Sequence, residues 1–291
     1  MDGIVPLLKP PGMTSSNAVY DIRRIYSEKH AGHLGTLDPG AAGVLPICIG
    51  RATRLFDYLV DKEKTYLFEV SFGVSTDTQD VFGAVTGTSD LVVSEEMLRA
   101  VLPSFLGRQM QAASVFSALK VDGKKMYDLA RAGKEVEPRY REIVLSDLAY
   151  LGQTGPNRFL LSVVCSRGTY IRSLCADMGE RLHGKAHMSF LLRTASGPFS
   201  IEHAYTVQEL IWMGVQGRLT ETLTSCEDAL AFLPTLTLPE DRRTPTLNGL
   251  DTFLKGQPDG DVRLYCGGFL GIGKVEKGRV KLNVHLYDRD A

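Results

Sequence analysis

The stretch from residue 32 to residue 50, GHLGTLDPGAAGVLPICIG, constrains this chain most strongly, because it sets one carboxylate in a short turn rich in glycine and proline. Pro39 disfavours the helical region for the preceding Asp38 and favours an extended backbone there. Glycines on both sides of the turn allow another chain or a ligand to approach closely. An isolated Asp-Pro-Gly is usually only a connecting turn. The long flanking pattern, which contains no second acid, instead predicts that Asp38 is presented to a partner.

Composition is typical of a globular protein. The chain has 291 residues, of which 44% are hydrophobic and 23% charged, so it can bury a sizeable core in one large domain or in a main domain plus a small one. No apolar run approaches the roughly 20 residues that span a bilayer, and the N-terminus lacks the order of a signal peptide. We therefore expect no membrane association and a cytoplasmic location.

The cysteines give no sign of a metal or redox site. There are five, an odd number, and they are scattered without the CxxC pair typical of zinc or redox sites. We expect them to be reduced and mostly packed in the interior.

Net charge alone argues against a broadly basic nucleic-acid-binding protein, since it is −1. The charge is unevenly distributed, however. Residues 200–240 hold six acids and one base, Arg218, which leaves 32 bases against 28 acids in the remainder. A local basic track for RNA is therefore compatible with the sequence.

Strand and helix patterns interleave through most of the chain, which predicts an α+β fold. Thr14 or Ser15 is positioned to cap one helix and Ser94 another. Periodicity predicts strands at residues 4–8, 65–74 and 159–168, and further helices at residues 52–60, 124–133 and 169–184.

Prolines in the segment PTLTLPEDRRTP, residues 234–245, predict a domain boundary. From residue 236 onward the chain has short strands punctuated by glycine, which is typical of a small β-barrel. The sequence therefore predicts one domain at residues 1–235 and a second at residues 236–291.

The Asp38 segment, extended by GRAT at residues 50–53, resembles the first catalytic motif of the tRNA pseudouridine synthase B family. Further similar segments are KPPGMTS, SALKVDGKKMYDLARAG and GKAHMSFLLRTASGPF, at residues 9–15, 117–133 and 184–199. The resemblance implies a catalytic domain built on a mixed, mainly antiparallel sheet. FLGIGKVEKGRVKLNV near the C-terminus resembles the last hairpin of a PUA domain, which implies a PUA-like RNA-binding barrel at residues 236–291.

The activity that this resemblance implies is isomerisation of uridine 55 to pseudouridine in the T loop of tRNA, without cofactor or metal. The reaction breaks the bond from C1′ to N1 and joins C1′ to C5 of the same base. The sugar becomes cationic or glycal-like on the way, so an ionised carboxylate beside it is the natural catalyst. Asp38 would fill this role, either by attacking C1′ or by removing the 2′ proton; the sequence leaves both routes open.

Partners for this carboxylate also follow from the resemblance. CSRGTYIRSL, residues 165–174, resembles the family's KGTYIR motif, in which the arginine corresponding to Arg172 pairs with the catalytic Asp and Arg167 replaces the usual lysine. Tyr66 corresponds to the tyrosine that stacks on the target base and helps to remove the C5 proton. Asp80, in TDTQD, corresponds to a residue that supports the site.

The resemblance to the synthase family also implies which residues bind the RNA. A target uridine stacked inside a loop must be flipped out, with His33 filling the vacated space and Tyr170 and Leu191 contacting the flipped nucleotide. We expect further contacts to the RNA from a set of basic residues and from the C-terminal domain; these residues are Lys9, Arg167, Lys120, Lys124 and Lys125. The expected partner is the tRNA T stem-loop, bound by a monomer with no obligate protein partner.

Three alternatives remain open at this level. The first is a dyskerin-like enzyme that modifies RNA chosen by a guide ribonucleoprotein. The second is a non-catalytic RNA-binding or RNA-folding protein that uses the same surface. The third is a sugar hydrolase, for which no second positioned carboxylate is evident.

Overall fold

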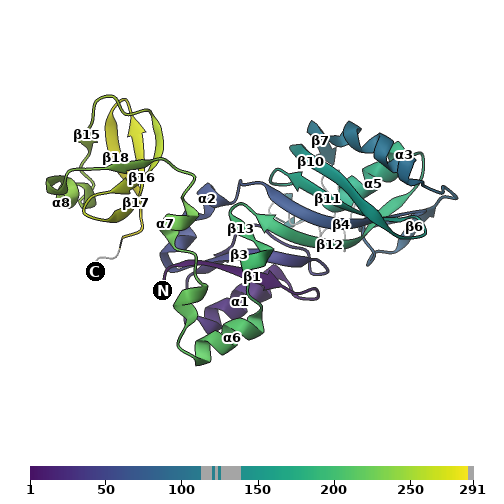
Figure 1. Cartoon of the computed structure of the whole chain (residues 1–291), viewed down its shortest axis with the longest axis horizontal. Helices are drawn as coiled ribbons and strands as arrows, with labels where there is room; N and C mark the ends of the chain where they lie inside the picture. Colours follow the sequence, from purple (N-terminus) through teal and green to yellow (C-terminus); the bar gives the residue numbers. More distant parts are fainter. Residues whose placement is uncertain (113–119, 122–123, 126–138, 288–291) are drawn as a thin grey trace.

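A mixed β-sheet forms the centre of the larger part of the molecule (Figure 1). The computed structural model describes residues 1–112, 120–121, 124–125 and 139–287. Among them, the sheet has the order β1-β3-β12-β4-β11-β10-β7, with β2 paired to β3 and β13 to β12. Only β12 and β3 run parallel within this described sheet; its other pairs are antiparallel. The expected α+β class and mixed sheet are thus confirmed.

The strands of this sheet are β1 (Gly3–Lys9), β2 (Ala31–His33), β3 (Ala42–Ile49), β4 (Lys64–Phe72), β7 (Gly107–Ala112), β10 (Tyr140–Gly155), β11 (Arg158–Cys165), β12 (Ala186–Ser196) and β13 (Phe199–Ser200). Two small hairpins are formed by β5 (Val74–Thr76) with β6 (Val85–Thr88), and by β8 (Lys120–Val121) with β9 (Lys124–Lys125). The α-helices of this part are α1 (Ser15–Ile25), α2 (Phe56–Leu59), α3 (Glu95–Val101), α5 (Ile171–Arg181), α6 (Val207–Val215) and α7 (Cys226–Ala229).

Local sequence signals explain where the first helices begin. The Thr14 side chain accepts a hydrogen bond from the Asn17 amide, which caps α1, and the Ser94 side chain accepts one from the Met97 amide, which caps α3. Each bond satisfies one of the amides that a helix leaves without a partner in its first turn. Both predicted caps are confirmed.

Two predicted helices differ in form. At residues 52–60 the chain makes a 3-10 helix, Gly50–Leu55, followed by the single turn of α2. The Thr53 hydroxyl donates to the Gly50 carbonyl at 2.7 Å, and this local bond competes with regular helical pairing. The helix after Ser94 ends as an α-helix at Val101 and continues as a 3-10 helix, Leu102–Phe105, because Pro103 lacks the amide hydrogen that a further turn needs. The helix predicted at residues 124–133 lies largely outside the described residues.

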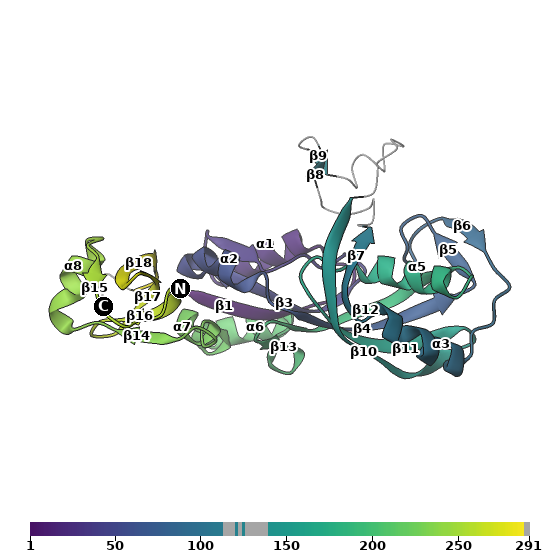
Figure 2. The same ribbon diagram turned by 90° about the horizontal axis from the view of Figure 1, so that it is seen from above.

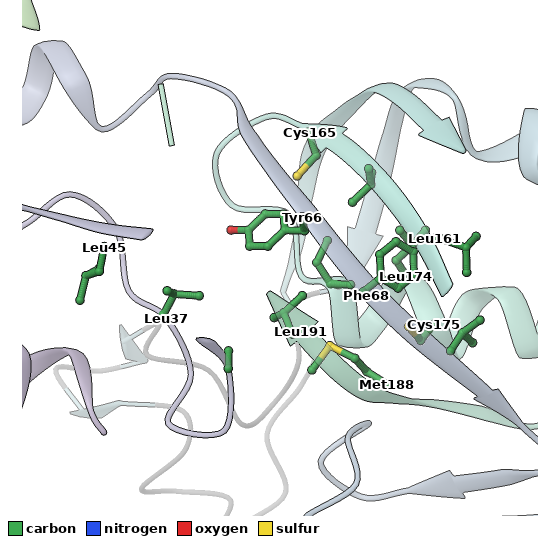
Figure 3. Packing of buried hydrophobic residues seen from close by; sticks show 14 of the residues in the cluster. Leu37, Leu45, Tyr66, Phe68, Leu161, Cys165, Leu174, Cys175, Met188 and Leu191 are labelled. Carbon is green, nitrogen blue, oxygen red and sulfur yellow. The ribbon is translucent and has the colours of Figure 1, made fainter. Parts of the chain in front are cut away.

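The main core is packed between this sheet and the helices that cover it. β4 alternates strictly between buried and half-buried positions, and its inward-facing Phe68 packs with residues of α5 and β12 (Figure 3). Tyr66 belongs to the same core, and Figure 3 shows its hydroxyl pointing away from Phe68, towards the side where Leu37 lies. One buried strand therefore supplies both packing and a polar group.

A second sheet, of five strands in the described residues, forms one end of the molecule in Figures 1 and 2. Its order is β14-β16-β17-β18-β15. The elements are β14 (Thr235–Thr237), α8 (Arg243–Leu247), β15 (Thr252–Phe253), β16 (Gly260–Tyr265), β17 (Phe269–Glu276) and β18 (Arg279–His285). The sheet has its own core, and Ile272 of β17 and Leu286, just after β18, share a second buried cluster with Ile4 and Cys48 of the large sheet. Burial of these side chains fixes the second sheet against the first.

Candidate active site

The Asp38 turn connects β2 to β3, and its backbone is held from two sides. The Ser15 hydroxyl at the start of α1 donates to the Leu37 carbonyl and accepts from the Leu37 amide, both at 2.9 Å. On the other side of Asp38, the Gly12 amide donates to the Pro39 carbonyl at 2.7 Å. The Asp38 side chain, between these anchors, is 41% exposed. The structure thus presents this carboxylate to solvent from a fixed backbone.

Lys9 stabilises the backbone next to Asp38 from the protein interior. It is fully buried, and its ammonium donates to the carbonyls of Pro10, Met13 and Pro39 at 2.9, 2.8 and 3.4 Å. Burial lowers the pKa of Lys9 to about 8, although the nearby Asp38 charge acts in the opposite direction. Lys9 therefore ties the KPPG turn to the Asp38 turn.

Arg172 lies directly behind the Asp38 carboxylate. Its side chain is 5% exposed, and its Nε lies 3.0 Å from Asp38 Oδ2 and 4.0 Å from Asp80 Oδ2. Its Nη1 also donates to the Thr78 carbonyl at 3.0 Å. A buried guanidinium with several fixed partners has one orientation, so it holds the Asp38 carboxylate in one orientation as well.

Asp80 organises the loop between β5 and β6. Its Oδ1 accepts hydrogen bonds from the Thr78 hydroxyl at 2.6 Å and from the Phe82 amide at 3.0 Å. Its carbonyl accepts a bond from the Thr76 hydroxyl at 2.6 Å. Through Asp80 the position of Arg172 is coupled to a loop more than ninety residues earlier in the chain.

Tyr66 and Arg193 occupy paired positions on β4 and β12. Tyr66 is 7% exposed, and burial raises the pKa of its hydroxyl, while hydrogen bonding and the charge of Arg193 act against that rise. The tyrosine is therefore neutral at pH 7, with a fixed cation beside its hydroxyl.

Arg193 is a site residue that the sequence patterns did not single out. It is 1% exposed, and its guanidinium donates to the carbonyls of Val44, Gly35 and Thr36 at 2.8, 3.3 and 3.5 Å. A fork of donors aimed at the chain on both sides of the Asp38 turn fixes the shape of that segment. The arginine inside the RTASG segment was the available signal, but its partners become evident only when β12 is placed beside β3.

A second buried lysine lies close to Arg193. The Lys64 ammonium donates to the carbonyls of Val60 and Lys62 at 2.9 and 2.6 Å. Its pKa is lowered to about 8 by burial and, to a smaller extent, by the charge of Arg193. Together these groups make one side of the site cationic, which suits a substrate that carries phosphates.

These residues surround a pocket of about 380 Å³. Its lining includes all three residues predicted to be catalytic, Asp38, Tyr66 and Arg172, together with Arg193 and Lys64. Of the residues predicted to bind RNA, the lining includes His33, Tyr170, Leu191 and Arg167. Lys9 and Asp80 are absent from the lining: Asp80 lies 4.0 Å from the lining residue Arg172, and Lys9 bonds to the carbonyl of Pro39, next to Asp38.

The predicted nucleotide contacts differ in how firmly they are held. Two hydrogen bonds fix Tyr170 to the side chain of Gln111. Gln111 Nε2 donates to the Tyr170 carbonyl at 3.0 Å, and the Tyr170 backbone amide donates to Gln111 Oε1 at 2.8 Å. His33 Nδ1 is buried with no hydrogen-bond partner among the described residues, and burial lowers its pKa, so the ring is neutral at pH 7. Leu191 is 8% exposed. Arg167 forms an exposed ion pair with Asp61 at 2.5 Å, which RNA phosphates can replace at little cost.

The structure leaves some predicted contacts undescribed. The side chains of Lys120, Lys124 and Lys125 lie outside the described residues. Within the described part of the chain, no cluster of three His, Cys, Asp or Glu side chains is arranged to hold a metal ion. No helix in that part is long and apolar enough to cross a membrane.

Two sequence profiles match the chain in succession. The profile of the TruB family pseudouridylate synthase N-terminal domain covers residues 23–171, and that of the tRNA pseudouridylate synthase B C-terminal domain covers residues 172–231. Asp38, Tyr66 and Asp80 lie in the first segment, and Arg172 begins the second.

Several curated proteins named tRNA pseudouridine synthase B are similar over most of their length. The protein from Pelotomaculum thermopropionicum is 42% identical, over 92% of this chain and 86% of its own. The protein from Caldanaerobacter subterraneus subsp. tengcongensis is 40% identical, over 97% and 98% of the two chains. The protein from Bacillus subtilis is 43% identical, over 80% and 78%.

Two solved structures share this fold over almost the whole chain. A chain in an H/ACA RNP bound to a substrate RNA containing 2′-deoxyuridine superposes with a TM-score of 0.75 at 25% identity, covering 99% of this chain and 86% of the other. A chain in a Cbf5-Nop10-Gar1 complex gives a TM-score of 0.75 at 26% identity, with coverage of 99% and 86%.

Proposed function

This chain belongs to the TruB family and is a tRNA pseudouridine synthase, and on that basis we propose that its Asp38 carboxylate acts on uridine 55 of the T loop. One observation carries the assignment: a partly exposed carboxylate held at 3.0 Å by a buried arginine, at the edge of a pocket of about 380 Å³. A pocket of this size accommodates a nucleoside turned out of its stack.

The reaction is an isomerisation, so its atoms balance without a co-reactant. The bond from C1′ to N1 breaks, C1′ bonds to C5, the proton on C5 leaves, and N1 gains a proton. The carboxylate acts on the sugar while positive charge develops at C1′. Arg172 keeps the carboxylate oriented, and its own burial is compensated by Asp38, Asp80 and the Thr78 carbonyl.

Two routes use the same carboxylate. In one, Asp38 attacks C1′ and forms a covalent sugar intermediate; in the other, it removes the 2′ proton to give a glycal. Substituting deuterium at C2′ of the target uridine separates them, because only the second route breaks that bond. A slower single-turnover rate with the deuterated RNA supports the glycal route, and an unchanged rate supports attack at C1′.

Tyr66 is proposed to contact the base and to help remove the C5 proton. Its place in the pocket lining, its burial and the neighbouring Arg193 support this role. To accept the C5 proton the hydroxyl must first lose its own to solvent, and the cation beside it stabilises the phenolate that results. Arg193 also holds the backbone that precedes Asp38, so one side chain positions both reacting groups.

Access to the target is proposed to depend on base flipping. His33 would fill the space left in the RNA, and its neutral ring suits that role because no charge has to be buried with it. Tyr170 and Leu191 line the pocket and would contact the flipped nucleotide. Arg167, at the edge of the pocket, would exchange Asp61 for a phosphate.

We keep the division into residues 1–235 and 236–291 and propose that the second part is a PUA-like RNA-binding unit. Its separate five-stranded sheet and its own core support the division. Its firm packing on the first sheet gives it a fixed position from which to contact the RNA. Residues Lys120, Lys124 and Lys125 remain proposed phosphate contacts.

We further propose that the enzyme works in the cytoplasm as a monomer, without a guide RNA or protein partner. The chain spans 98% of the length of the relative from Caldanaerobacter, at 40% identity, and is less similar to the Cbf5 chain at 26%. A guide-dependent enzyme with the same fold is the alternative that the test must exclude.

The test is to incubate the purified chain with an unmodified tRNA transcript and map pseudouridine. We expect product at uridine 55 without any guide RNA, and none with Asp38→Asn. This nearly isosteric variant should still bind tRNA, because it removes charge and little bulk. Product that appears only after a guide RNP is added, or loss of tRNA binding in Asp38→Asn, would overturn the proposal.

A further inference from the structure

Phe82 is an aromatic residue placed in solvent beside the active site. It lies on the loop between β5 and β6, and 75% of it is exposed. Its neighbour Val81 is 52% exposed. Large apolar side chains next to each other in solvent gain nothing for the fold, and such patches commonly mark binding surfaces.

The loop that carries Phe82 is nonetheless firmly structured. The Phe82 amide donates to Asp80 Oδ1 at 3.0 Å, and the Ala84 amide donates to Asp77 Oδ1 at 2.8 Å. Gly83 has no room for a side chain, since a Cβ there would lie 2.3 Å from the Thr78 hydroxyl. The ring is therefore exposed from a fixed backbone, so holding it ready costs little entropy on binding.

One edge of the ring rests on the catalytic turn. A Cβ added to Gly40 would lie 2.2 Å from a ring carbon of Phe82, so the ring packs against the glycine backbone. Gly40 follows Asp38 by two residues, which places their Cα atoms within about 7 Å of each other. RNA bound with its target nucleoside at Asp38 therefore lies within reach of this ring.

We propose that Phe82 is a stacking platform for a nucleobase of the tRNA that flanks the target uridine. The inference rests on the proposed function, since it needs RNA at Asp38. A neutral aromatic ring offers a base a π-face and no hydrogen-bonding group, so it binds without reading sequence. The occupant follows from closeness to the pocket: Phe82 packs on Gly40, two residues after Asp38, and Asp38 lines the pocket that takes up the target nucleoside.

A series of substitutions at Phe82 can distinguish stacking on a base from simple apolar contact. Phe82→Ala removes the ring, Phe82→Leu keeps apolar bulk without a π-face, and Phe82→Tyr and Phe82→Trp keep the face. Trp212→Ala is the control, because Trp212 is an aromatic residue on α6 that is 56% exposed and is not among the pocket residues.

The measurement is the Kd for unmodified tRNA, with the single-turnover rate at saturating tRNA and the melting temperature alongside. A base stacked on an aromatic ring is typically worth about 1–3 kcal/mol, so Kd should rise by roughly 5- to 150-fold in Phe82→Ala. Phe82→Leu should resemble Phe82→Ala, whereas Tyr and Trp should restore binding. The saturating rate, the melting temperature and the control variant should stay close to wild type.

Three results would overturn the platform. If Phe82→Ala leaves the Kd for tRNA unchanged, the ring does not stack on a base. If Phe82→Leu has the wild-type Kd, the side chain acts through apolar packing on Gly40 instead of stacking. A fall in saturating rate at constant Kd likewise shows that the ring only supports the Asp38 turn. Failure of the proposed function is seen separately, as absence of pseudouridine with the wild-type protein, while the binding series still reports on Phe82.

Discussion

Arg172 Nε lies 3.0 Å from Asp38 Oδ2, and the arginine side chain is 5% exposed where the aspartate side chain is 41% exposed. The pair therefore joins a buried, fixed cation to a carboxylate that substrate can reach. Because Arg172 also has Asp80 and the Thr78 carbonyl as partners, the guanidinium is oriented before RNA arrives.

Arg172→Lys keeps the positive charge but loses the planar fork that contacts several partners at once. We expect the single-turnover rate to fall by about two orders of magnitude, a loss typical of removing one preorganised electrostatic group. The Kd for tRNA should change by less than about threefold, since the side chain is buried behind Asp38. A rate within a few fold of wild type would show that charge alone suffices.

Tyr66→Phe removes one hydroxyl from a buried ring and leaves the packing of β4 intact. If the hydroxyl takes part in removing the C5 proton, release of tritium from C5-labelled uridine should slow by at least about 10²-fold. The melting temperature serves as the control and should stay near wild type. Normal tritium release by this variant would assign the proton transfer to another group.

Arg193→Met is expected to weaken both fold and activity, because it leaves the carbonyls of Gly35, Thr36 and Val44 without their buried donor. Unsatisfied buried carbonyls and a lost charge-assisted network predict a loss of about 2–4 kcal/mol in unfolding free energy. Arg193→Lys, with one ammonium in place of the fork, should recover part of that stability. Denaturant unfolding measures both, and a Met variant as stable as wild type would refute the role of these bonds.

Gly43→Ala tests the close approach of β3 to β12. Gly43 has φ of +119°, and a Cβ there would lie 2.2 Å from the Arg193 carbonyl oxygen. The strained backbone and the clash with another backbone atom predict a loss of at least about 2–3 kcal/mol. Gly217→Ala is a matched control, since Gly217 has φ of +71° with nothing within 4 Å. Equal melting temperatures for the two variants would contradict the predicted clash.

Substituting Asp177 by Asn should stabilise the protein in a pH-dependent way. Burial, followed by the charge of Glu180, raises its pKa from 3.8 to about 6. Between these values the folded state binds more protons than the unfolded state, so stability from this group falls as pH rises through the window. Asp177→Asn removes the cost of the buried charge and should stabilise the protein by about 1–2 kcal/mol at pH 8, after allowing for partial exposure.

That gain should disappear near pH 4, where Asp177 in the folded protein is already protonated. Thermal melts of both proteins at pH 4, 6 and 8 give the comparison. A constant difference across the three values would show that the effect comes from packing instead of ionisation.

The sequence by itself determined features that depend on neighbouring residues. The caps at Thr14 and Ser94 and the alternation of β4 follow from local hydrogen bonding and from the period of a strand. The turn that presents Asp38 is local in the same sense, because Pro39 and the adjacent glycines restrict the backbone whatever the rest of the chain does. The resemblance to the family's motifs also identifies Asp38, Tyr66 and Arg172 as one catalytic set, although these residues lie in separate segments of the chain.

Only the tertiary structure decided how distant segments meet. Arg193 gains its buried partners because β12 lies parallel to β3, the buried Lys9 ammonium reaches the Pro39 carbonyl thirty residues away, and Phe82 rests on Gly40 because the β5–β6 loop folds back towards the Asp38 turn. None of these contacts has a local signal, since each joins residues far apart in the chain. Their energies depend on burial and on partner geometry, which exist only after the sheet order is fixed.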